Sequence, residues 1–418
     1  MDMANAKPVL ICCRKLDAFQ RAHAWALNRG LTSLLLSPAD WPNSTSIAAE
    51  FGAAGIITDE PSQPHFCKCR VTDAASLPQE RPGEPGAWPD PVAILFTSGS
   101  TGAPTAVSKD ARAILGEFAL LKAWFRDGPP MTDFISTVPL EHMFGYTFAF
   151  WLPHLMNGAI LEKRPVIPTD LKNACAAVKK PAWVITTPTH LRAYAQLPSG
   201  FDNVAGLICS TSPLSTDLAR AAASRFKAPI TEIYGSTESG AVAARVRTAD
   251  EQATPGWMPL PGIGIQPSSA GTAVCSIPHV AGAVELSDLI EMDGPRFSVL
   301  GRTGDLVKIC GKRHSLAALN QMLAGAPGVR DSAYFISDAA APAETQRAAA
   351  LVVLSEGYST EDVLGGLRGM IDDVFLPRPI YAVDDIPRTD AGKIRNSDLQ
   401  RMFQSLSVTG VLHLTEEN

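Results

Sequence analysis

Residues 93–104 read Ala-Ile-Leu-Phe-Thr-Ser-Gly-Ser-Thr-Gly-Ala-Pro, an apolar run that passes directly into glycines and small hydroxylated residues. The apolar run predicts a buried strand, and the residues after it predict a loop. Glycines let main-chain N–H groups approach an anion, and Ser and Thr add hydroxyl donors, so such a loop can bind phosphate. Taken alone, the stretch also fits an ordinary Ser/Gly-rich turn. It is not a Walker A loop, because the GxxxxGK[ST] pattern is absent.

Strands and helices alternate on both sides of this stretch. Helices are predicted over 17–30 and 44–52, and strand–helix–strand alternation is typical of parallel βαβ units. The proline-rich residues 61–90 predict a connecting segment, and residues 255–270 predict a loop region. Buried strands are predicted at 8–13, 31–38, 55–60, 93–98, 133–139, 183–188, 206–210 and 230–235.

A smaller unit is predicted after about residue 303, where apolar runs at 349–356 and 379–387 indicate further strands. We therefore expect an α/β protein with two domains. Residues 1–302 form a large N-terminal domain of βαβ units with parallel sheets, and residues 303–418 form a small, mobile α+β C-terminal domain.

The composition excludes several classes of protein. The chain is 46% hydrophobic and 19% charged, which is typical of a globular protein and excludes a mainly disordered one. Its net charge is −6 and its basic residues are scattered, so a nucleic-acid partner is not expected. Residues 143–161 are apolar, but Pro153, His154 and Asn157 interrupt them, which predicts a buried core helix and no membrane span.

The eight cysteines favour a reduced protein. Only Cys67 and Cys69 suggest a metal knuckle, and no second pair completes four ligands. Cys12, Cys209 and Cys310 lie in apolar runs, where cysteine behaves as a small hydrophobic residue. The N-terminus has an acidic residue at position 2 and only a short apolar run, unlike a signal peptide. A cytoplasmic location is expected.

Three further motifs follow the glycine-rich stretch. Tyr234-Gly-Ser-Thr-Glu238 ends a predicted strand and offers an aromatic ring, hydroxyls and a carboxylate; a carboxylate beside phosphate oxygens is a usual Mg²⁺ ligand. Gly301-Arg-Thr-Gly-Asp-Leu-Val-Lys-Ile-Cys-Gly311 lies at the predicted domain boundary. Pro387-Arg-Thr-Asp-Ala-Gly-Lys393 places a lysine after a glycine near the C-terminus.

The order and spacing of these four motifs, from about residue 93 to 396, resemble the adenylate-forming enzymes, also called AMP-dependent synthetases and ligases. This superfamily includes acyl- and aryl-CoA synthetases, nonribosomal-peptide adenylation domains and luciferase. The first ninety residues match the family only loosely and are shorter than is usual for it.

The resemblance identifies the glycine-rich stretch as the loop that binds the phosphates of ATP. The family's usual lysine after the proline is replaced here by Thr105 and Ala106, and Lys109 is a candidate substitute. The residues that match the loop are Thr97, Ser98, Gly99, Ser100, Thr101 and Gly102.

The resemblance also assigns nucleotide contacts to the later motifs. Tyr234, with Gly235 and Ser236 after it, matches the residue that stacks on adenine. Thr237 matches the contact to the α-phosphate, and Glu238 matches the Mg²⁺ ligand.

Two acidic residues compete for the ribose contact. Asp288 resembles the family's ribose-binding aspartate, with Ser287 replacing the family's glycine. Thr303-Gly-Asp305 has a similar sequence, but Gly301-Arg302 precedes it as in the family's hinge segment. The resemblance therefore assigns the ribose contact to Asp288 and not to Asp305. Arg302 is expected to hold ribose or phosphate oxygens as a fixed cation.

Lys393 resembles the family's lysine that reaches the carboxylate and the α-phosphate. A cation is needed there because charge builds on oxygens as the carboxylate attacks phosphorus. The alternative is a solvated surface lysine. His142 matches the family's histidine beside the acyl pocket. The alternative is a core histidine whose hydrogen bonds are satisfied within the protein.

The substrate pocket departs from the family pattern. Ser210, Thr211 and Ser212 replace a glycine-rich segment, and bulkier side chains there predict a shorter or more polar pocket, which favours small aryl or short acyl acids. The run Phe148-Ala-Phe-Trp151 lacks the aspartate that pairs with a substrate ammonium, so an acid without an α-amino group is favoured.

The expected reaction has two steps. A carboxylic acid and MgATP give an acyl-adenylate and pyrophosphate, and then a thiol takes the acyl group and releases AMP. The acceptor is coenzyme A or the phosphopantetheine of an acyl carrier protein acting in trans. Two alternatives stay open: transfer to a non-thiol nucleophile, and a non-enzymatic, regulatory nucleotide-binding protein with the same fold.

Overall fold

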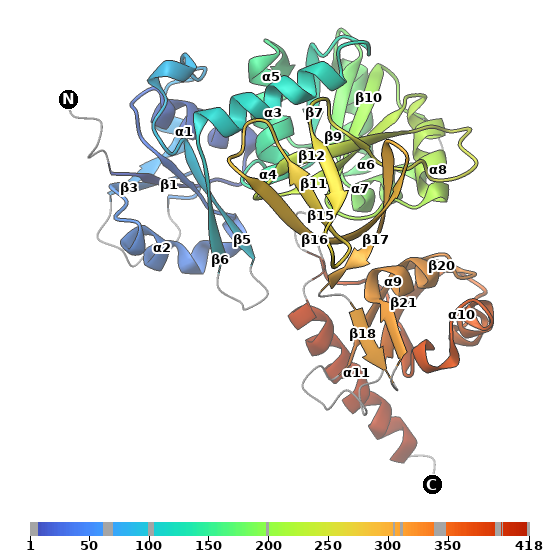
Figure 1. Ribbon diagram of the computed structural model, residues 1–418. Helices are drawn as coiled ribbons and strands as arrows, with labels where there is room; N and C mark the ends of the chain where they lie inside the picture. The colour runs from blue at the N-terminus through green and yellow to red at the C-terminus, as the bar shows by residue number, and fades with distance from the viewer. Residues whose placement is uncertain are drawn as a thin grey trace. The chain divides into compact units, whose positions relative to one another are not determined.

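The computed structural model describes residues 7–61, 70–98, 104–197, 200–303, 306–309, 312–337, 348–388, 394 and 396–415 (Figure 1). It divides into two compact units, one of Met1–Gly264 with Cys275–Val284 and one of Ile265–Val274 with Glu285–Asn418. This division falls earlier in the chain than the domain boundary predicted after residue 302, which stays a prediction. The α/β class is confirmed.

The first unit begins with a six-stranded sheet in the order β4-β3-β1-β2-β5-β6. All neighbours pair in parallel except β5 and β6, which form an antiparallel hairpin. In Figure 1, α1 (Leu16–Leu27) lies above this sheet and α2 (Ser44–Glu50) lies below it. The strands are β1 Val9–Cys12, β2 Ser33–Leu35, β3 Gly55–Thr58, β4 Arg70–Asp73, β5 Ala93–Ser98 and β6 Pro104–Lys109.

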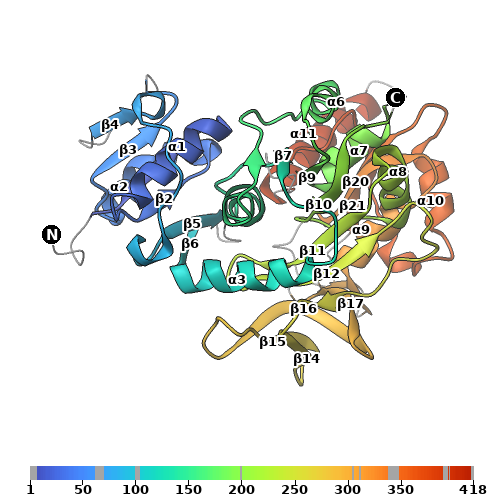
Figure 2. The same cartoon turned by 90° about the horizontal axis from the view of Figure 1, so that it is seen from above.

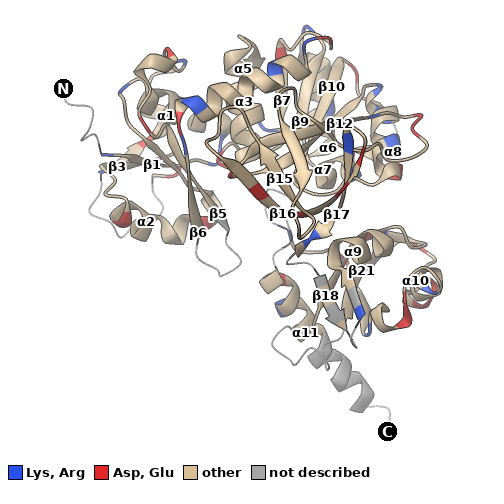
Figure 3. Ribbon diagram, viewed as in Figure 1, with Lys and Arg blue, Asp and Glu red and all other residues tan. Residues whose placement is uncertain are grey.

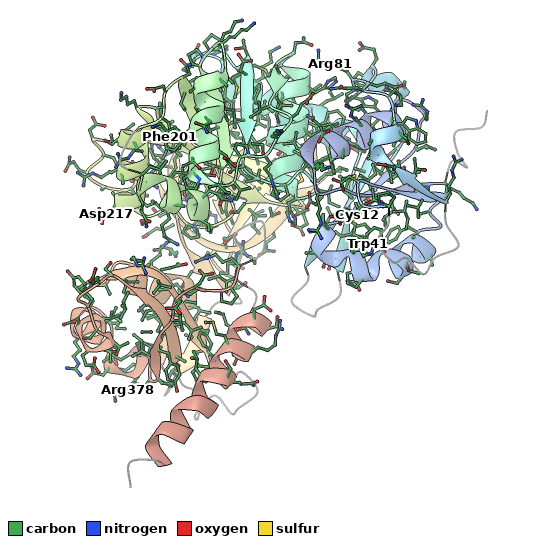
Figure 4. All side chains as sticks on the ribbon, turned by 180° about the vertical axis from the view of Figure 1, so that it is seen from behind. Cys12, Trp41, Arg81, Phe201, Asp217 and Arg378 are labelled. Carbon is green, nitrogen blue, oxygen red and sulfur yellow. The ribbon has the colours of Figure 1, made fainter. Side chains whose placement is uncertain are left out.

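Burial explains why this sheet was predictable. The strands are continuous apolar runs because helices cover both faces of a parallel sheet. Leu10 of β1 and Ile56 of β3 pack with Ile47 of α2, and Cys12 and Trp41, labelled in Figure 4, belong to the same cluster. The prediction that residues 61–90 only connect is wrong in part, because β4 pairs with β3 inside that stretch.

A second sheet of seven strands carries most of the candidate site. Its order is β13-β12-β11-β10-β9-β7-β8, parallel from β8 to β11, with β12 and β13 antiparallel at one edge. The strands are β7 Asp133–Ser136, β8 Ala159–Ile160, β9 Ala182–Thr186, β10 Val204–Cys209, β11 Ile230–Ser236, β12 Gly240–Arg247 and β13 Met258–Pro259.

Helices cover the seven-stranded sheet. Leu171 of α6 (Pro168–Ala177), Tyr194 of α7 (Pro188–Ala195) and Phe226 of α8 (Thr216–Phe226) share one buried cluster with β9 and β10. Phe201, labelled in Figure 4, stacks on Phe226 at 4.0 Å between ring centroids. The helix α3 (Ala111–Trp124) extends from the end of β6 to the β11–β12 hairpin (Figure 2).

The apolar stretch after residue 142 is buried, as predicted, but it is not one regular helix. It comprises α4 (Met143–Gly145), a π-helical turn over Tyr146–Trp151 and α5 (Leu152–Leu155). All six residues of the π-helical turn are buried. Among the described residues, no helix combines the length and the apolar character that crossing a membrane requires.

The second unit contains most of a four-stranded sheet and a smaller α+β part. The sheet runs β14-β15-β16-β17, and β14 together with β13 corrects the prediction that residues 255–270 are a loop. Its strands are β14 Gly264–Pro267, β15 Thr272–Ser276, β16 Ala283–Asp293 and β17 Arg296–Arg302.

The smaller part is built on a three-stranded sheet, β20-β21-β22, in which β21 confirms the strand predicted at 349–356. Its two faces pack against different helices: Leu319 and Val363 lie on one side, and Leu399 on the other. The elements are β18 Leu306–Ile309, β19 Lys312–Ser315, α9 Leu316–Ala324, β20 Val329–Ile336, β21 Ala348–Leu354, α10 Thr360–Leu367, β22 Ile380–Ala382 and α11 Asn396–Thr415.

Candidate active site

The Tyr234–Glu238 motif ends β11 and begins a tight hairpin. Ser236 pairs with Gly240, and the N–H groups of Ser236 and Ser239 donate to each other's hydroxyl oxygens at 3.0 and 3.2 Å. A Cβ on Gly235 would lie 2.0 Å from the carbonyl oxygen of Gly240, so only glycine fits there. The short turn that carries Thr237 and Glu238 therefore has little freedom to move.

Thr237 and Glu238 present polar groups on this turn, and the Glu238 carboxylate attracts the charge of Lys109. Thr237 is half-buried and Glu238 is exposed. Within the described ranges, neither the Thr237 hydroxyl nor the Glu238 carboxylate has a hydrogen-bond or ion-pair partner. A hydroxyl donor beside an unpaired carboxylate fits a phosphate oxygen and its Mg²⁺, because magnesium prefers carboxylate and phosphate oxygens.

The ring of Tyr234 belongs to a stack. Its centroid lies 5.4 Å from that of Trp257, and the guanidinium carbon of Arg245 lies 4.0 Å from the Trp257 centroid. Arg245 in turn donates two hydrogen bonds to the carboxylate of Glu232, at 2.8 and 3.0 Å. A cation over an indole face is attractive, and the bidentate ion pair fixes the cation. This stack holds the aromatic ring that was predicted to contact adenine.

A buried lysine and a buried glutamate lie next to the turn. Lys109, at the end of β6, places its Nζ 3.5 Å from the main-chain oxygen of Glu238. Glu117, on α3, accepts hydrogen bonds from the Ala241 N–H at 2.8 Å and the Thr147 hydroxyl at 3.2 Å. Burial lowers the pKa of Lys109 and raises the pKa of Glu117, and attraction between the two charges opposes both shifts. Sequence reasoning missed Glu117, although a lone acidic residue beside Leu120 on an apolar helix face is a signal.

The end of β10 is unusual. The Ser210 hydroxyl donates to the main-chain oxygen of Ile233 at 2.9 Å, so it ties two strands together. Thr211 has a φ of +87°, and its buried hydroxyl has no partner among the described residues. A threonine in the left-handed region is strained, and such strain gathers at functional sites. The assignment of Ser210, Thr211 and Ser212 to the substrate pocket stays a prediction.

Sequence reasoning also missed a polar cluster where β7 and β9 end. The Nδ1 of His190 lies 3.2 Å from the Thr137 hydroxyl oxygen and 3.1 Å from that of Thr187. Burial and the charge of Arg164 lower the pKa of His190 to about 4, so the ring is neutral at pH 7. His142 lies one residue before α4 and is half-buried, and its role at an acyl pocket stays a prediction.

In the second unit, the structure brings Asp288 and Arg302 together. They are opposite each other on β16 and β17, and Arg302 Nε donates to Asp288 Oδ1 at 3.0 Å. Asp288 is only 8% exposed, and this ion pair fixes its carboxylate. Its competitor Asp305 lies outside the described residues, as does Gly304.

Part of the predicted site lies on residues that the structure does not describe. Thr97 and Ser98 end β5, opposite Thr105 and Pro104 of β6. The described part of the chain holds no group of three or more His, Cys, Asp or Glu residues that could bind a metal. Predicted residues outside the described ranges are Gly99, Ser100, Thr101, Gly102, Lys393, Cys67, Cys69 and Cys310.

The described residues also show how the charged side chains and the cysteines are distributed. Over the coloured part of the ribbon, Figure 3 shows Lys and Arg interspersed with Asp and Glu, and no described helix or strand is uniformly basic. Burial raises the pKa of the thiols of Cys12, Cys13, Cys175 and Cys209, which are unpaired and therefore act as apolar core side chains.

Comparison with known proteins identifies the family of the chain. The family model for AMP-binding enzymes matches residues 7–275. A 4-coumarate–CoA ligase of Cereibacter sphaeroides is 26% identical over 306 residues, which cover 71% of this chain and 69% of that ligase.

Two solved structures share the fold. The ATP-bound MatB of Rhodopseudomonas palustris gives a TM-score of 0.76 at 19% identity, covering 97% of this chain and 90% of MatB. The O-succinylbenzoate coenzyme A synthetase MenE of Bacillus subtilis, in complex with AMP, gives 0.75 at 14% identity, covering 93% and 87%. At these identities the likeness concerns the fold.

Proposed function

The chain belongs to the AMP-binding enzyme family, and from that premise we propose that it activates a carboxylic acid with ATP and passes the acyl group to a thiol. In the first step a carboxylate oxygen attacks the α-phosphorus, the bond from that phosphorus to the bridging oxygen breaks, and pyrophosphate leaves. In the second step the thiol sulfur attacks the acyl carbon, the carbon–oxygen bond to the phosphate breaks, and AMP leaves while the thiol proton goes to solvent.

One observation supports this proposal above the others. The open Thr237 hydroxyl and Glu238 carboxylate stand on a rigid turn directly after Tyr234, within the part that the family model matches. Tyr234 stacks on adenine, Thr237 donates to the α-phosphate, and Glu238 holds the magnesium of MgATP. A bound Mg²⁺ would neutralise charge on the phosphate oxygens.

Lys393 supplies the cation where charge develops on the carboxylate and α-phosphate oxygens. Residues 303–418 move as a lid that carries this lysine, and Asp288 with Arg302 holds the ribose. The phosphate loop is Thr97–Gly102. These assignments rest on the family motifs. The Asp288–Arg302 ion pair supports the assignment of the ribose contact, because it presents a fixed carboxylate.

We propose a small aryl or short acyl acid as substrate, with His142 and Ser210–Ser212 at its pocket. The strained Thr211 and its buried hydroxyl support a short, polar pocket floor. The relative named 4-coumarate–CoA ligase supports an aryl acid and coenzyme A, and an acyl carrier protein in trans is the other acceptor. The buried, unpaired cysteines support a cytoplasmic location.

An exchange assay tests the proposal. The purified protein is incubated with ATP, labelled pyrophosphate, Mg²⁺ and single acids from a panel of aryl, short acyl and amino acids. We expect label in ATP with one or a few aryl or short acyl acids, followed by AMP release that requires coenzyme A or a phosphopantetheinyl carrier. ATP binding without exchange for any acid would contradict the proposal and favour a regulatory nucleotide-binding protein.

A further inference from the structure

Lys109 and Glu117 take no part in the chemistry proposed above, yet both touch the turn that carries Thr237 and Glu238. Each side chain is 5% exposed. Lys109 comes from β6, directly after the glycine-rich stretch, and Glu117 comes from the second turn of α3. Two charged side chains from neighbouring segments therefore converge on one hairpin.

The fit of Glu117 against this hairpin is close. Gly240 has a φ of +69°, and a Cβ there would lie 2.9 Å from both the carboxyl carbon and Oε1 of Glu117. The Glu117 carboxylate thus sits against the main chain of Gly240 and accepts the N–H of Ala241 at 2.8 Å. Its other oxygen accepts from Thr147, in the π-helical turn that follows His142.

The energetics argue that this pair does more than stabilise the fold. Removing a charged side chain from water is expensive, and Lys109 and Glu117 attract each other without forming a direct ion pair. Well-packed apolar residues in place of buried opposite charges are often neutral or stabilising. A buried pair is therefore weak evidence for stability. What apolar residues could not supply are hydrogen bonds to the carbonyl of Glu238 and the N–H of Ala241, one on each side of the turn.

We propose that Lys109 and Glu117 are positioning residues that hold the Thr237–Glu238 turn in its Mg²⁺·ATP-binding conformation before the ligand arrives. Lys109 acts through the main-chain oxygen of Glu238, and Glu117 acts through the N–H of Ala241. A ligand that meets a fixed turn does not have to order it, so the binding affinity is higher. This inference rests on the proposed function, because it takes Glu238 as the magnesium ligand.

Positioning and simple charge predict opposite results for Lys109. ATP and its Mg²⁺ complex are both net anions, so if charge alone mattered, Lys109→Met would weaken ATP binding at least as much without Mg²⁺ as with it, and the affinity gained from Mg²⁺ would stay or increase. If the contact to Glu238 matters, the same change removes that gain. Glu117→Gln keeps an acceptor for Ala241 and offers a donor to Thr147, so it should retain most of the affinity, whereas Glu117→Leu removes both hydrogen bonds.

The experiment is calorimetric titration of ATP into the full-length protein, with and without Mg²⁺. We expect Lys109→Met and Glu117→Leu to bind ATP about tenfold more weakly in Mg²⁺ and within twofold of wild type in its absence. Glu117→Gln should stay within threefold of wild type. Lys122→Met, an exposed lysine on the same helix, is the matched control and should change nothing.

The outcomes separate the inference from the proposed function. A wild-type protein that gains no ATP affinity from Mg²⁺ would refute the role of Glu238 and hence the proposed function. If Mg²⁺ increases the ATP affinity of the wild type, and increases it as much or more in Lys109→Met and Glu117→Leu, then the positioning role is overturned and the proposed function stands. If thermal melts show that these variants do not fold, Thr147→Val replaces them, because it removes only the hydrogen bond to Glu117; an unchanged gain in that variant also counts against the inference.

Discussion

Two antiparallel hairpins, β5–β6 and β11–β12, are attached to the two parallel sheets, and they are supported in different ways. The β5–β6 hairpin pairs without a register shift, from Ala93 with Lys109 to Ser98 with Pro104. On β6, Thr105, Ala106 and Ser108 are exposed. The β11–β12 hairpin has a register shift after Tyr234, and the first five residues of β12 are buried.

Both hairpins carry the same kinds of residue, Ser, Thr and Gly, so composition does not separate them. The difference lies in what surrounds them: the β11–β12 turn has Glu117 and Lys109 against its main chain, whereas β6 has solvent on much of its length. Lys109 links the two, because it stands at the base of one hairpin and contacts the turn of the other. We infer that the turn proposed to bind Mg²⁺ needs a fixed frame, while the loop proposed to bind phosphate would supply its ligands from its own backbone.

The largest expected effect concerns a residue on neither hairpin. We propose that the hairpins bind the nucleotide and that Lys393 stabilises the charge that develops on the carboxylate and α-phosphate oxygens. Lys393→Ala should then slow acyl-adenylate formation by two to three orders of magnitude, which is about 3–4 kcal/mol of transition-state stabilisation. ATP affinity should change little. Single-turnover kinetics with a Lys312→Ala control measure this, and a near wild-type rate would show that the lysine is wrongly assigned.

A change inside the buried hairpin should affect stability. Gly235→Ala places a Cβ 2.0 Å from a main-chain oxygen, so we expect it to lower the free energy of unfolding by about 2–3 kcal/mol. Gly86→Ala is the control, because a Cβ there meets nothing within 4 Å. Denaturant unfolding of both variants provides the measurement, and equal stability would mean that the hairpin is not rigid.

The ribose contact tests whether binding extends beyond the two hairpins. Asp288→Ala should weaken ATP binding at least tenfold, about 1.4 kcal/mol, because a fixed carboxylate that accepts the ribose hydroxyls is lost. Asp305→Ala should leave ATP affinity nearly unchanged. Calorimetry on both variants decides between them, and the reverse result would transfer the ribose contact to Asp305.

The smallest expected effect tests the exposed hairpin. Thr105→Lys restores the family's usual lysine at an exposed position, where a long side chain meets no packing constraint. We expect unchanged stability and a few-fold lower KM for ATP, under 1 kcal/mol. A melting temperature several degrees lower, or a higher KM, would show that this hairpin is as constrained as the other.

Much of the fold was predictable because its strands are buried on both faces. β1, β9 and β10 are uninterrupted apolar runs, and such runs stand out in a sequence. β4 was missed because Arg70–Asp73 is a polar edge strand, and the π-helical turn was missed because its residues also fit a regular helix.

The candidate site was predictable where its residues are consecutive, as in Tyr234–Glu238. It was not predictable where partners are distant in sequence. Glu117 and Ala241 are 124 positions apart, and nothing in the local pattern of either residue indicates that one accepts the other's N–H. The pairing of Asp288 with Arg302 similarly depends on the register of two strands.

The contacts of Lys109 and Glu117 to the Thr237–Glu238 turn involve its backbone, and this has a consequence for protein engineering. Lys109 contacts the carbonyl of residue 238 and Glu117 contacts the N–H of residue 241, so both hydrogen bonds are made to the backbone, although the Glu238 carboxylate also attracts Lys109. We expect both backbone contacts to persist when positions 237 and 238 are varied in a library. Such a library would vary the side-chain chemistry of the turn while keeping the shape of the hairpin, and it would test the proposed metal-binding role of Glu238 directly.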